Sequence, residues 1–295
     1  MRELTVFKKD INLKEWSKRG ARENDYSKLI TEPVIIKNNE GKILCIYAKL
    51  ESDPSLITKV FQSTEYATSM RTRGLKTTSR VFGFLPRETI RKDFCSATSM
   101  AKIQPKHHAV VCEYGKNLAK VYKYLDPEMY EKHIKQTEDE IQDGWVLEKT
   151  PFTSGIINKN NPLNYHFDRG NFRDVYSAML TIKKDIQGGN LVLPEYDVAF
   201  QLDNNSVFLF DGQGILHGVT PIKKTSTRAY RFTAVYYTMK QMWQCDDTTV
   251  ELERVRRLKT EKEDRRNRYL KGELTEEELM NYRRSGFSTK QHGKK

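Results

Sequence analysis

Three side chains that can bind a metal ion stand in two short segments of the sequence. His166 and Asp168 lie in the run HFD, and His217 lies in the run GILHGV. Residues two apart on an extended segment project to the same side, so His166 and Asp168 can reach one ion. His217 comes far enough along the chain for the strands of a jelly roll to return it to the same place. Two His and one carboxylate on one face of Fe(II) leave the opposite positions open, as in non-haem iron oxygenases. An HxD pair alone arises often by chance, as a surface His and a turn Asp, so the distal His carries much of this prediction.

The segment 230–238, YRFTAVYYT, alternates like a strand and contains a candidate anion-binding pair. Arg231, Thr233 and Tyr237 share one face of such a strand. An Arg that points into a barrel needs an anionic partner, because an unpaired buried charge is costly. The distal carboxylate of 2-oxoglutarate would pair with Arg231 through two hydrogen bonds, and the Thr233 hydroxyl would add a third. Arg228, on the opposite face, is the competing candidate, and a salt bridge to a protein acid is the alternative role for Arg231.

These residues together predict an oxygenase with Fe(II) as its metal and with 2-oxoglutarate and O2 as co-substrates. Such a site needs a β barrel to carry its ligands, and residues 150–240 have the pattern of one. Short apolar runs are separated there by turn residues, including Gly188-Gly189 and Asp203-Asn204-Asn205. Many short strands with this punctuation favour a β sandwich or barrel. The expected strands are 152–157, 175–182, 191–193, 198–202, 207–210 and 230–238.

A small N-terminal hairpin and a helix are expected before this barrel. The segments 34–37 and 43–49 have the composition of strands and flank the turn Asn38-Asn39-Glu40-Gly41. Asp53-Pro54 begins a helix that is expected to run through about Tyr66. The segment 67–80 is expected to be a basic loop.

Helices are expected on either side of the barrel sequence as well. Asp126-Pro127 begins one that ends near Gly144, with Asp as the cap and Pro at the first position. Residues 246–284 predict a highly charged helix pair broken at Gly272. The fold class is therefore α+β, a double-stranded β-helix (jelly-roll or cupin-like) core with supporting N-terminal helices and a charged C-terminal helical extension. The predicted division is 1–66 as an N-terminal α/β extension, 67–245 as the dioxygenase domain with its catalytic β core at about 150–240, and 246–295 as the C-terminal extension.

The charge balance favours a polyanionic partner. The 295 residues hold 51 Lys and Arg against 39 Asp and Glu, a net charge of +12 with a pI near 9.3. A merely soluble, well-charged surface is the alternative. No apolar run approaches the roughly 18 residues that a membrane span needs, and no apolar signal core is seen, so no membrane association is expected. The candidate phosphate contacts, with a solvated loop as their alternative, are Arg71, Arg73, Lys76 and Arg80.

The four cysteines are scattered and form no CxxC pair. This spacing predicts reduced thiols, with neither a zinc site nor a disulfide framework. The residues concerned are Cys45, Cys95, Cys112 and Cys245.

The stretches PFTSGIINKNNPLNYHFDRGN, GGNLVLPEY, FDGQGILHGVTP and YRFTAVYY resemble the TET/JBP superfamily of nucleic-acid dioxygenases, especially its compact bacteriophage-type members. The resemblance is firm over residues 150–240 and extends from about residue 80. It implies oxidation of the 5-methyl group of pyrimidines in DNA, with the target base flipped out of the duplex. It implies that the iron ligands are His166, Asp168 and His217. It also implies that Arg231 and Thr233 bind 2-oxoglutarate.

The resemblance also implies residues for substrate binding. Asn171 matches the Asn of an HxDxxN pattern that contacts the flipped base, and Tyr237 falls where an aromatic residue lines the base pocket. An ordinary turn residue in DRGN and a core tyrosine are the respective alternatives. The chain departs from the animal TET enzymes at Met239, where they carry a base-contacting His, and it lacks their Cys-rich region.

The leading expectation is hydroxylation of 5-methylcytosine in DNA to 5-hydroxymethylcytosine and further oxidised forms. The alternatives are a thymine hydroxylase that makes 5-hydroxymethyluracil, a protein side-chain hydroxylase, and a catalytically silent DNA-binding module on the same fold. DNA that contains 5-methylpyrimidines is thus the expected partner, and no protein partner is predicted. We expect the protein inside the cell, in the cytoplasm or at the nucleoid, with a phage genome as one source.

Overall fold

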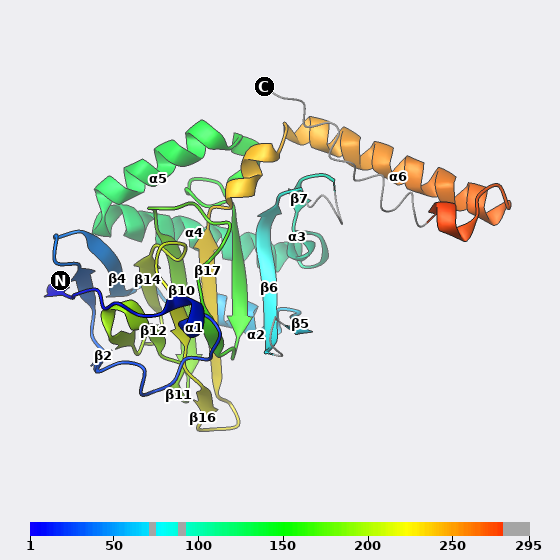
Figure 1. Cartoon of the computed structure of the whole chain (residues 1–295). Helices are drawn as coiled ribbons and strands as arrows, with labels where there is room; N and C mark the ends of the chain where they lie inside the picture. The colour runs from blue at the N-terminus through cyan, green and yellow to red at the C-terminus, as the bar shows by residue number, and fades with distance from the viewer. Residues whose placement is uncertain (71–74, 88–92, 280–295) are drawn as a thin grey trace.

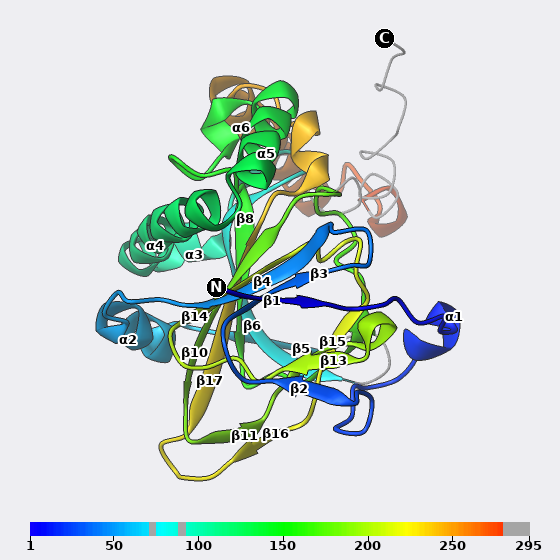
Figure 2. The same cartoon turned by 90° about the vertical axis from the view of Figure 1, so that its left-hand side faces the viewer.

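A computed structural model describes residues 1–70, 75–87 and 93–279. Two β-sheets pack face to face, and helices cover the outer face of the larger one (Figure 1). Figure 2 places α2, α3 and α4 on one side of the large sheet and the small sheet on the other. This is the α+β double-stranded β-helix that the sequence predicts.

The large sheet runs in the order β1-β3-β4-β14-β10-β17-β8-β6-β5, with β7 paired to β6. Its strands are β1 (Arg2–Thr5), β3 (Val34–Lys37), β4 (Ile43–Lys49), β5 (Ala67–Met70), β6 (Lys76–Leu85), β7 (Ser96–Ala97), β8 (Ser154–Lys159), β10 (Ser177–Lys184), β14 (Ser206–Phe210) and β17 (Tyr230–Tyr237).

The small sheet runs in the order β2-β13-β12-β15-β9, and a two-stranded ribbon joins β11 to β16. These strands are β2 (Lys28–Ile30), β9 (Leu163–His166), β11 (Ile186–Gly188), β12 (Leu191–Leu193), β13 (Val198–Phe200), β15 (His217–Val219) and β16 (Ile222–Lys224). The N-terminal residues therefore supply strands to both sheets.

The helical elements lie mainly outside the sheets. They are α1 (Leu13–Trp16), α2 (Ser55–Ser63), α3 (Ser99–Ile103), α4 (Pro105–Leu125), α5 (Pro127–Glu140), α6 (Thr248–Leu270), and the 3-10 helices η1 (Asp143–Trp145), η2 (Pro194–Tyr196) and η3 (Lys240–Gln244). Helix α6 projects away from the body (Figure 1). Among the described residues, none of these helices combines the length and apolarity that a membrane crossing demands.

The protein has two apolar cores, one beneath the helices and one between the sheets. Successive residues of β17 point alternately to these two sides of the large sheet. Phe232 and Tyr236 face the helices, where they pack with Phe61 and Tyr122. Arg231, with the other residues of its parity, faces the space between the sheets. The second core lies between the two sheets and includes Tyr47, Leu193, Phe200, Phe208 and Phe210.

Most predicted elements are present. The hairpin β3–β4 has the predicted bounds, all six predicted barrel strands form within a few residues of their expected ends, and α2 follows Pro54. Helix α5 begins at Pro127, where the Asp126 side chain accepts a hydrogen bond of 3.0 Å from the Met129 backbone N–H. Helix α6 ends before Gly272, whose φ of +76° suits a helix stop. The end of the predicted second helix lies outside the described residues.

Two expectations about local structure are wrong, and one long helix was not predicted. The expected basic loop at 67–80 contains β5 and the start of β6, two paired strands whose β-branched Thr residues favour extended structure. Helix α5 ends at Glu140, and the residues near Gly144 form η1. Helix α4 was not predicted, although it supplies much of the layer that covers the large sheet.

The prediction that all four cysteines are reduced thiols is also wrong. Cys95 and Cys245 form a disulfide with their Cα atoms 5.7 Å apart. The pair is 150 residues apart in sequence, so no local spacing signals it. It ties the segment before β7 to the segment before α6, whereas Cys45 and Cys112 are free.

Candidate active site

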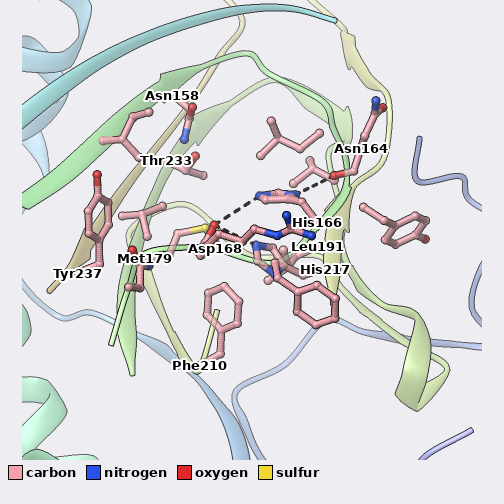
Figure 3. Close-up of a pocket in the computed structure, with 18 of the residues that line it drawn as sticks. Asn158, Asn164, His166, Asp168, Met179, Leu191, Phe210, His217, Thr233 and Tyr237 are labelled. Carbon is pink, nitrogen blue, oxygen red and sulfur yellow. Dashed lines mark hydrogen bonds and ion pairs between the residues drawn. The ribbon is translucent and has the colours of Figure 1, made fainter. Parts of the chain in front are cut away.

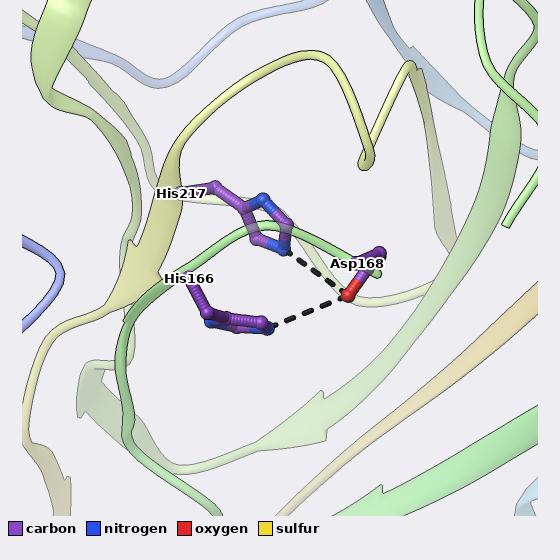
Figure 4. Close-up of side chains that lie close together, drawn as sticks. All are labelled: His166, Asp168 and His217. Atoms are coloured by element: carbon purple, nitrogen blue, oxygen red, sulfur yellow. Dashed lines mark ion pairs between the residues drawn. The ribbon is translucent and has the colours of Figure 1, made fainter. Parts of the chain in front are cut away.

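Adjacent strands of the small sheet bring the two predicted histidine ligands together. His166 ends β9 and His217 begins β15, and the two residues are direct partners across this antiparallel pair. Asp168 follows two residues after His166, and its backbone N–H donates to the Gly212 carbonyl at 2.8 Å. The Asp168 Oδ1 atom lies 3.5 Å from Nε2 of His166 and 3.8 Å from Nε2 of His217 (Figure 4).

Both histidine rings are oriented for metal binding. Their Nδ1–H groups donate to backbone carbonyls, His166 to Asn164 at 2.7 Å and His217 to Ile215 at 2.9 Å. Each Nε2 then faces Asp168, as in metal sites where a second bond fixes the ring. Burial, and next the neighbouring His166, lowers the pKa of His217 to about 4, so this ring is neutral at pH 7. Two imidazoles and one carboxylate, with ligand atoms within 4.8 Å of one another, fit Fe(II).

Gly212 leaves the space that the Asp168 carboxylate occupies. A Cβ atom at this position would lie 2.4 Å from Asp168 Oδ2 and 3.2 Å from its Cγ. The absence of a side chain at Gly212 therefore leaves room for the Asp168 carboxylate beside the two histidines.

We predict that Gly212→Ala weakens metal binding although it changes no ligand. The added methyl group would push the Asp168 carboxylate out of reach of the ion, and we expect affinity for Mn(II) to fall about 10- to 100-fold, the size of effect seen for groups that orient metal ligands. Isothermal titration calorimetry would measure it. Gly41→Ala is the control for backbone strain alone, because Gly41 has φ of +82° while a Cβ atom there meets nothing within 4 Å, and it does not line the cavity. Equal Mn(II) affinity in the two variants would contradict the prediction.

Arg231 is a buried cation that lacks a full set of partners. It is 3% exposed, and its Nη2 atom has no hydrogen-bond partner among the described residues. Burial lowers its pKa to about 10, so the guanidinium remains charged at pH 7. Gly189, with φ of +68°, lets the backbone pass close by, since a Cβ there would lie 3.0 Å from Arg231 Nε. An unpaired buried charge of this kind fits an anionic co-substrate. The competing Arg228 is exposed.

The cavity between the sheets has a volume of about 630 Å³ and changes character along β17 (Figure 3). Arg231 is followed by the polar pair Thr233 and Asn158, which are partners across β17 and β8. Val235 comes next in an apolar row, and Tyr237 lies at the far end. The cavity thus has a cationic and polar end for a carboxylate and an aromatic end for another molecule. Facing β17 are His166 and His217 on the small sheet and Asp168 in the loop after β9.

The other sequence-predicted residues divide into three groups. Asn171 and Tyr237 line the cavity, and Asn171 forms a β-bridge with Met239, which lines it as well. Lys76 is exposed at the start of β6. Arg80 is opposite Ile157, which packs in the core beneath the helices, so Arg80 lies on the face of the sheet away from the cavity. The expected contacts Arg71 and Arg73 lie outside the described residues.

Several cavity residues were missed by sequence reasoning. Most of them come from strands whose register no local motif reveals, and Arg169 lies in the turn directly after Asp168. They are Asn158, Asn164, Arg169, Met179, Leu191 and Phe210.

The fold and the site together define an oxygenase that depends on Fe(II), 2-oxoglutarate and O2. The chain belongs to the Tet_JBP family, since residues 86–240 match the family model described as the oxygenase domain of the 2OGFeDO superfamily. That family match agrees with the resemblance to TET/JBP enzymes noted in the sequence.

Individual relatives agree with this assignment. The chain is 25% identical over 213 residues to "Thymine dioxygenase JBP1" of Trypanosoma brucei brucei, which covers 69% of this chain and 25% of that protein. It is 30% identical over 122 residues to "Bifunctional helicase and thymine dioxygenase JBP2" of Leishmania major, covering 41% of this chain and 11% of the relative. The chain therefore spans a quarter or less of the length of these relatives.

A solved structure supports the fold. The protein in "NgTET1 in complex with 5mC DNA" superposes with a TM-score of 0.54 at 15% identity, covering 82% of this chain and 94% of that one. At this identity the likeness concerns the fold alone.

Proposed function

We propose that this protein is a DNA dioxygenase that hydroxylates the 5-methyl group of 5-methylcytosine to 5-hydroxymethylcytosine. The single observation that carries the proposal is the two-ended cavity, with Arg231 at one end, Asn171 and Tyr237 at the other, and the three metal-binding side chains facing it from the opposite side. The net charge of +12 supports a polyanionic substrate. The names of the TET and JBP relatives support DNA bases as the substrate class.

In this proposal each part of the cavity has one task. His166, Asp168 and His217 hold Fe(II) from one side, while Arg231 and Thr233 hold the far carboxylate of 2-oxoglutarate. When bound, iron and 2-oxoglutarate activate O2, so that one oxygen atom enters a substrate C–H bond and the other leaves in succinate, with release of CO2. The apolar row between the two ends excludes water from the reacting methyl group.

A base inside a duplex cannot reach a recessed metal, so the target base would be flipped into the cavity. Tyr237 offers a ring for stacking, and Asn171 offers polar atoms to the base edge. The Asn171 amide contacts Ser177 Oγ at 3.4 Å, and the amide group can offer an acceptor or a donor to the base. An acceptor complements the N4 amino group of cytosine, whereas thymine presents a carbonyl at that position.

A thymine hydroxylase is the second candidate, because the curated relatives are named thymine dioxygenases. An Asn171 acceptor would receive a hydrogen bond from the N4 amino group of 5-methylcytosine or from the N3–H group of thymine. The two candidate substrates therefore differ in this one contact. Under this alternative the product is 5-hydroxymethyluracil.

Mass spectrometry of nucleosides separates these proposals. The purified protein would be incubated with Fe(II), 2-oxoglutarate, ascorbate and duplex DNA that contains both thymine and 5-methylcytosine. We expect loss of 5-methylcytosine and gain of its hydroxymethyl product. Gain of 5-hydroxymethyluracil would favour the second candidate. Salt-sensitive DNA binding without any turnover of 2-oxoglutarate would instead indicate a silent binding module.

We also predict that Asn171→Ala lowers kcat/KM for the DNA substrate about 10- to 100-fold, the loss expected for one base-edge hydrogen-bond contact. Affinity for 2-oxoglutarate should stay unchanged, because Asn171 lies at the other end of the cavity. Steady-state kinetics with varied DNA and calorimetry with 2-oxoglutarate would measure the two effects. Equal losses in both would show that the variant disturbs the whole site.

A further inference from the structure

A buried asparagine stands beside the residues proposed to hold 2-oxoglutarate. Asn158 on β8 is 5% exposed, lines the cavity and is the direct cross-strand partner of Thr233. Side chains that are partners on one face of an antiparallel pair lie within contact distance. Figure 3 shows the Asn158 amide next to Thr233.

The hydrogen bonds of Asn161 fix which end of the Asn158 amide faces the cavity. The Thr78 backbone N–H donates to Asn161 at 2.9 Å, so the accepting atom must be the Asn161 oxygen. The other terminal atom of Asn161 is therefore nitrogen, and it donates to the Thr78 carbonyl at 2.9 Å. Because both backbone groups of Thr78 are used, the orientation of Asn161 has no ambiguity.

The orientation of Asn161 determines the orientation of the Asn158 amide. The Asn161 nitrogen also donates to the Asn158 amide at 3.1 Å, so the receiving atom must be the Asn158 oxygen. The remaining terminal atom of Asn158 is the nitrogen, which carries two N–H donors. Within residues 1–70, 75–87 and 93–279, this nitrogen donates no hydrogen bond to the protein. An amide donor at a buried position calls for an acceptor.

We propose that Asn158 binds 2-oxoglutarate by donating an Nδ2–H hydrogen bond to the same distal carboxylate that Arg231 and Thr233 hold. The inference rests on the proposed role of those two residues. Arg231 lies two residues before Thr233 on the cavity face of β17, and Asn158 lies level with Thr233 on β8. A carboxylate in this corner receives a cation from one side and an N–H and an O–H from the other. Asn161 acts as a positioning residue, because it turns the donor end of Asn158 toward the cavity.

The test compares ligands that differ only in the distal carboxylate. Calorimetry would measure binding of 2-oxoglutarate and of 2-oxopentanoate, which lacks that group, to protein loaded with Mn(II) in place of iron. For Asn158→Ala we expect the Kd of 2-oxoglutarate to rise about 10- to 100-fold, as for one hydrogen bond to a charged group. The Kd of 2-oxopentanoate and of Mn(II) should not change. Asn161→Ala should give a smaller rise for 2-oxoglutarate.

Asn117→Ala is the matched control, since Asn117 is exposed on α4, which covers the face of the large sheet away from the cavity (Figure 2). Its 2-oxoglutarate affinity should equal that of the wild type. An unchanged Kd in Asn158→Ala, or an equal rise for both oxoacids, would overturn the proposal while leaving the function proposed above intact. Failure of the wild-type protein to bind 2-oxoglutarate would overturn both. Asn158→Asp keeps the shape and replaces the donor by an anion, so it should weaken 2-oxoglutarate binding more than Asn158→Ala does.

Discussion

The variant His217→Ala should lose 2-oxoglutarate turnover to background while remaining folded. His217 supplies one of only two imidazoles, and two remaining ligands cannot hold the ion in a fixed position with the open sites directed into the cavity. The fold should tolerate the change, because the side chain makes one hydrogen bond, to the Ile215 carbonyl, and lies beside a cavity. Succinate formation would measure turnover, and circular dichroism would report on the fold.

A histidine on the surface of α4 provides the control for this experiment. His107 is half-buried, its Nε2 contacts Ser63 Oγ at 2.9 Å, and it does not line the cavity. His107→Ala should keep wild-type turnover. Substantial succinate formation by His217→Ala in the presence of Fe(II) would mean that the metal is bound elsewhere.

The variant Arg231→Met should lose 2-oxoglutarate binding and yet be at least as stable as the wild-type protein in the absence of ligand. Removing one partner of a buried charge pair costs about 2–5 kcal/mol of binding free energy, so we expect affinity to fall by roughly two orders of magnitude. Without ligand the charge has no such partner, and an apolar side chain of similar size is neutral or stabilising at a site of this kind. The two effects have opposite signs, which a general folding defect would not produce.

Thermal unfolding with and without 2-oxoglutarate measures both effects for Arg231→Met. A ligand that binds only the folded protein raises its stability, so the wild type should show a higher Tm with 2-oxoglutarate, and the variant should show no change. Arg228→Met, at an exposed position, should behave as the wild type. If Arg231→Met unfolds at a lower temperature without ligand and still binds 2-oxoglutarate, then Arg231 forms a salt bridge with an acidic residue of the protein instead.

The metal-binding side chains could be predicted from sequence because their information is local. The pair His166 and Asp168 needs only the two-residue period of a strand, and Arg231 with Thr233 needs the same rule. His217 required one further assumption, that a β barrel returns the chain to the same place. The direct pairing of His166 with His217 across β9 and β15 explains why that assumption works.

The features that could not be predicted depend on contacts between distant segments. Asn158 is placed by the register of β8 against β17, and its orientation comes from Asn161 and from the backbone of β6. The Cys95–Cys245 disulfide spans 150 residues without any motif. The pairing of β5 with the start of β6 could not be predicted because the residues there are polar and show no apolar alternation, although Thr itself favours strands.

The most direct test of the whole account is mass spectrometry of nucleosides and succinate after a reaction under 18O2. The wild-type protein would be incubated with Fe(II), 2-oxoglutarate and duplex DNA that contains 5-methylcytosine, with His217→Ala run in parallel. We predict one 18O atom in the hydroxymethyl group of the product base and one in succinate, in equal yield, and neither product from the variant. Succinate formed without an oxidised base would place the substrate outside DNA, and an oxidised base from His217→Ala would contradict the site.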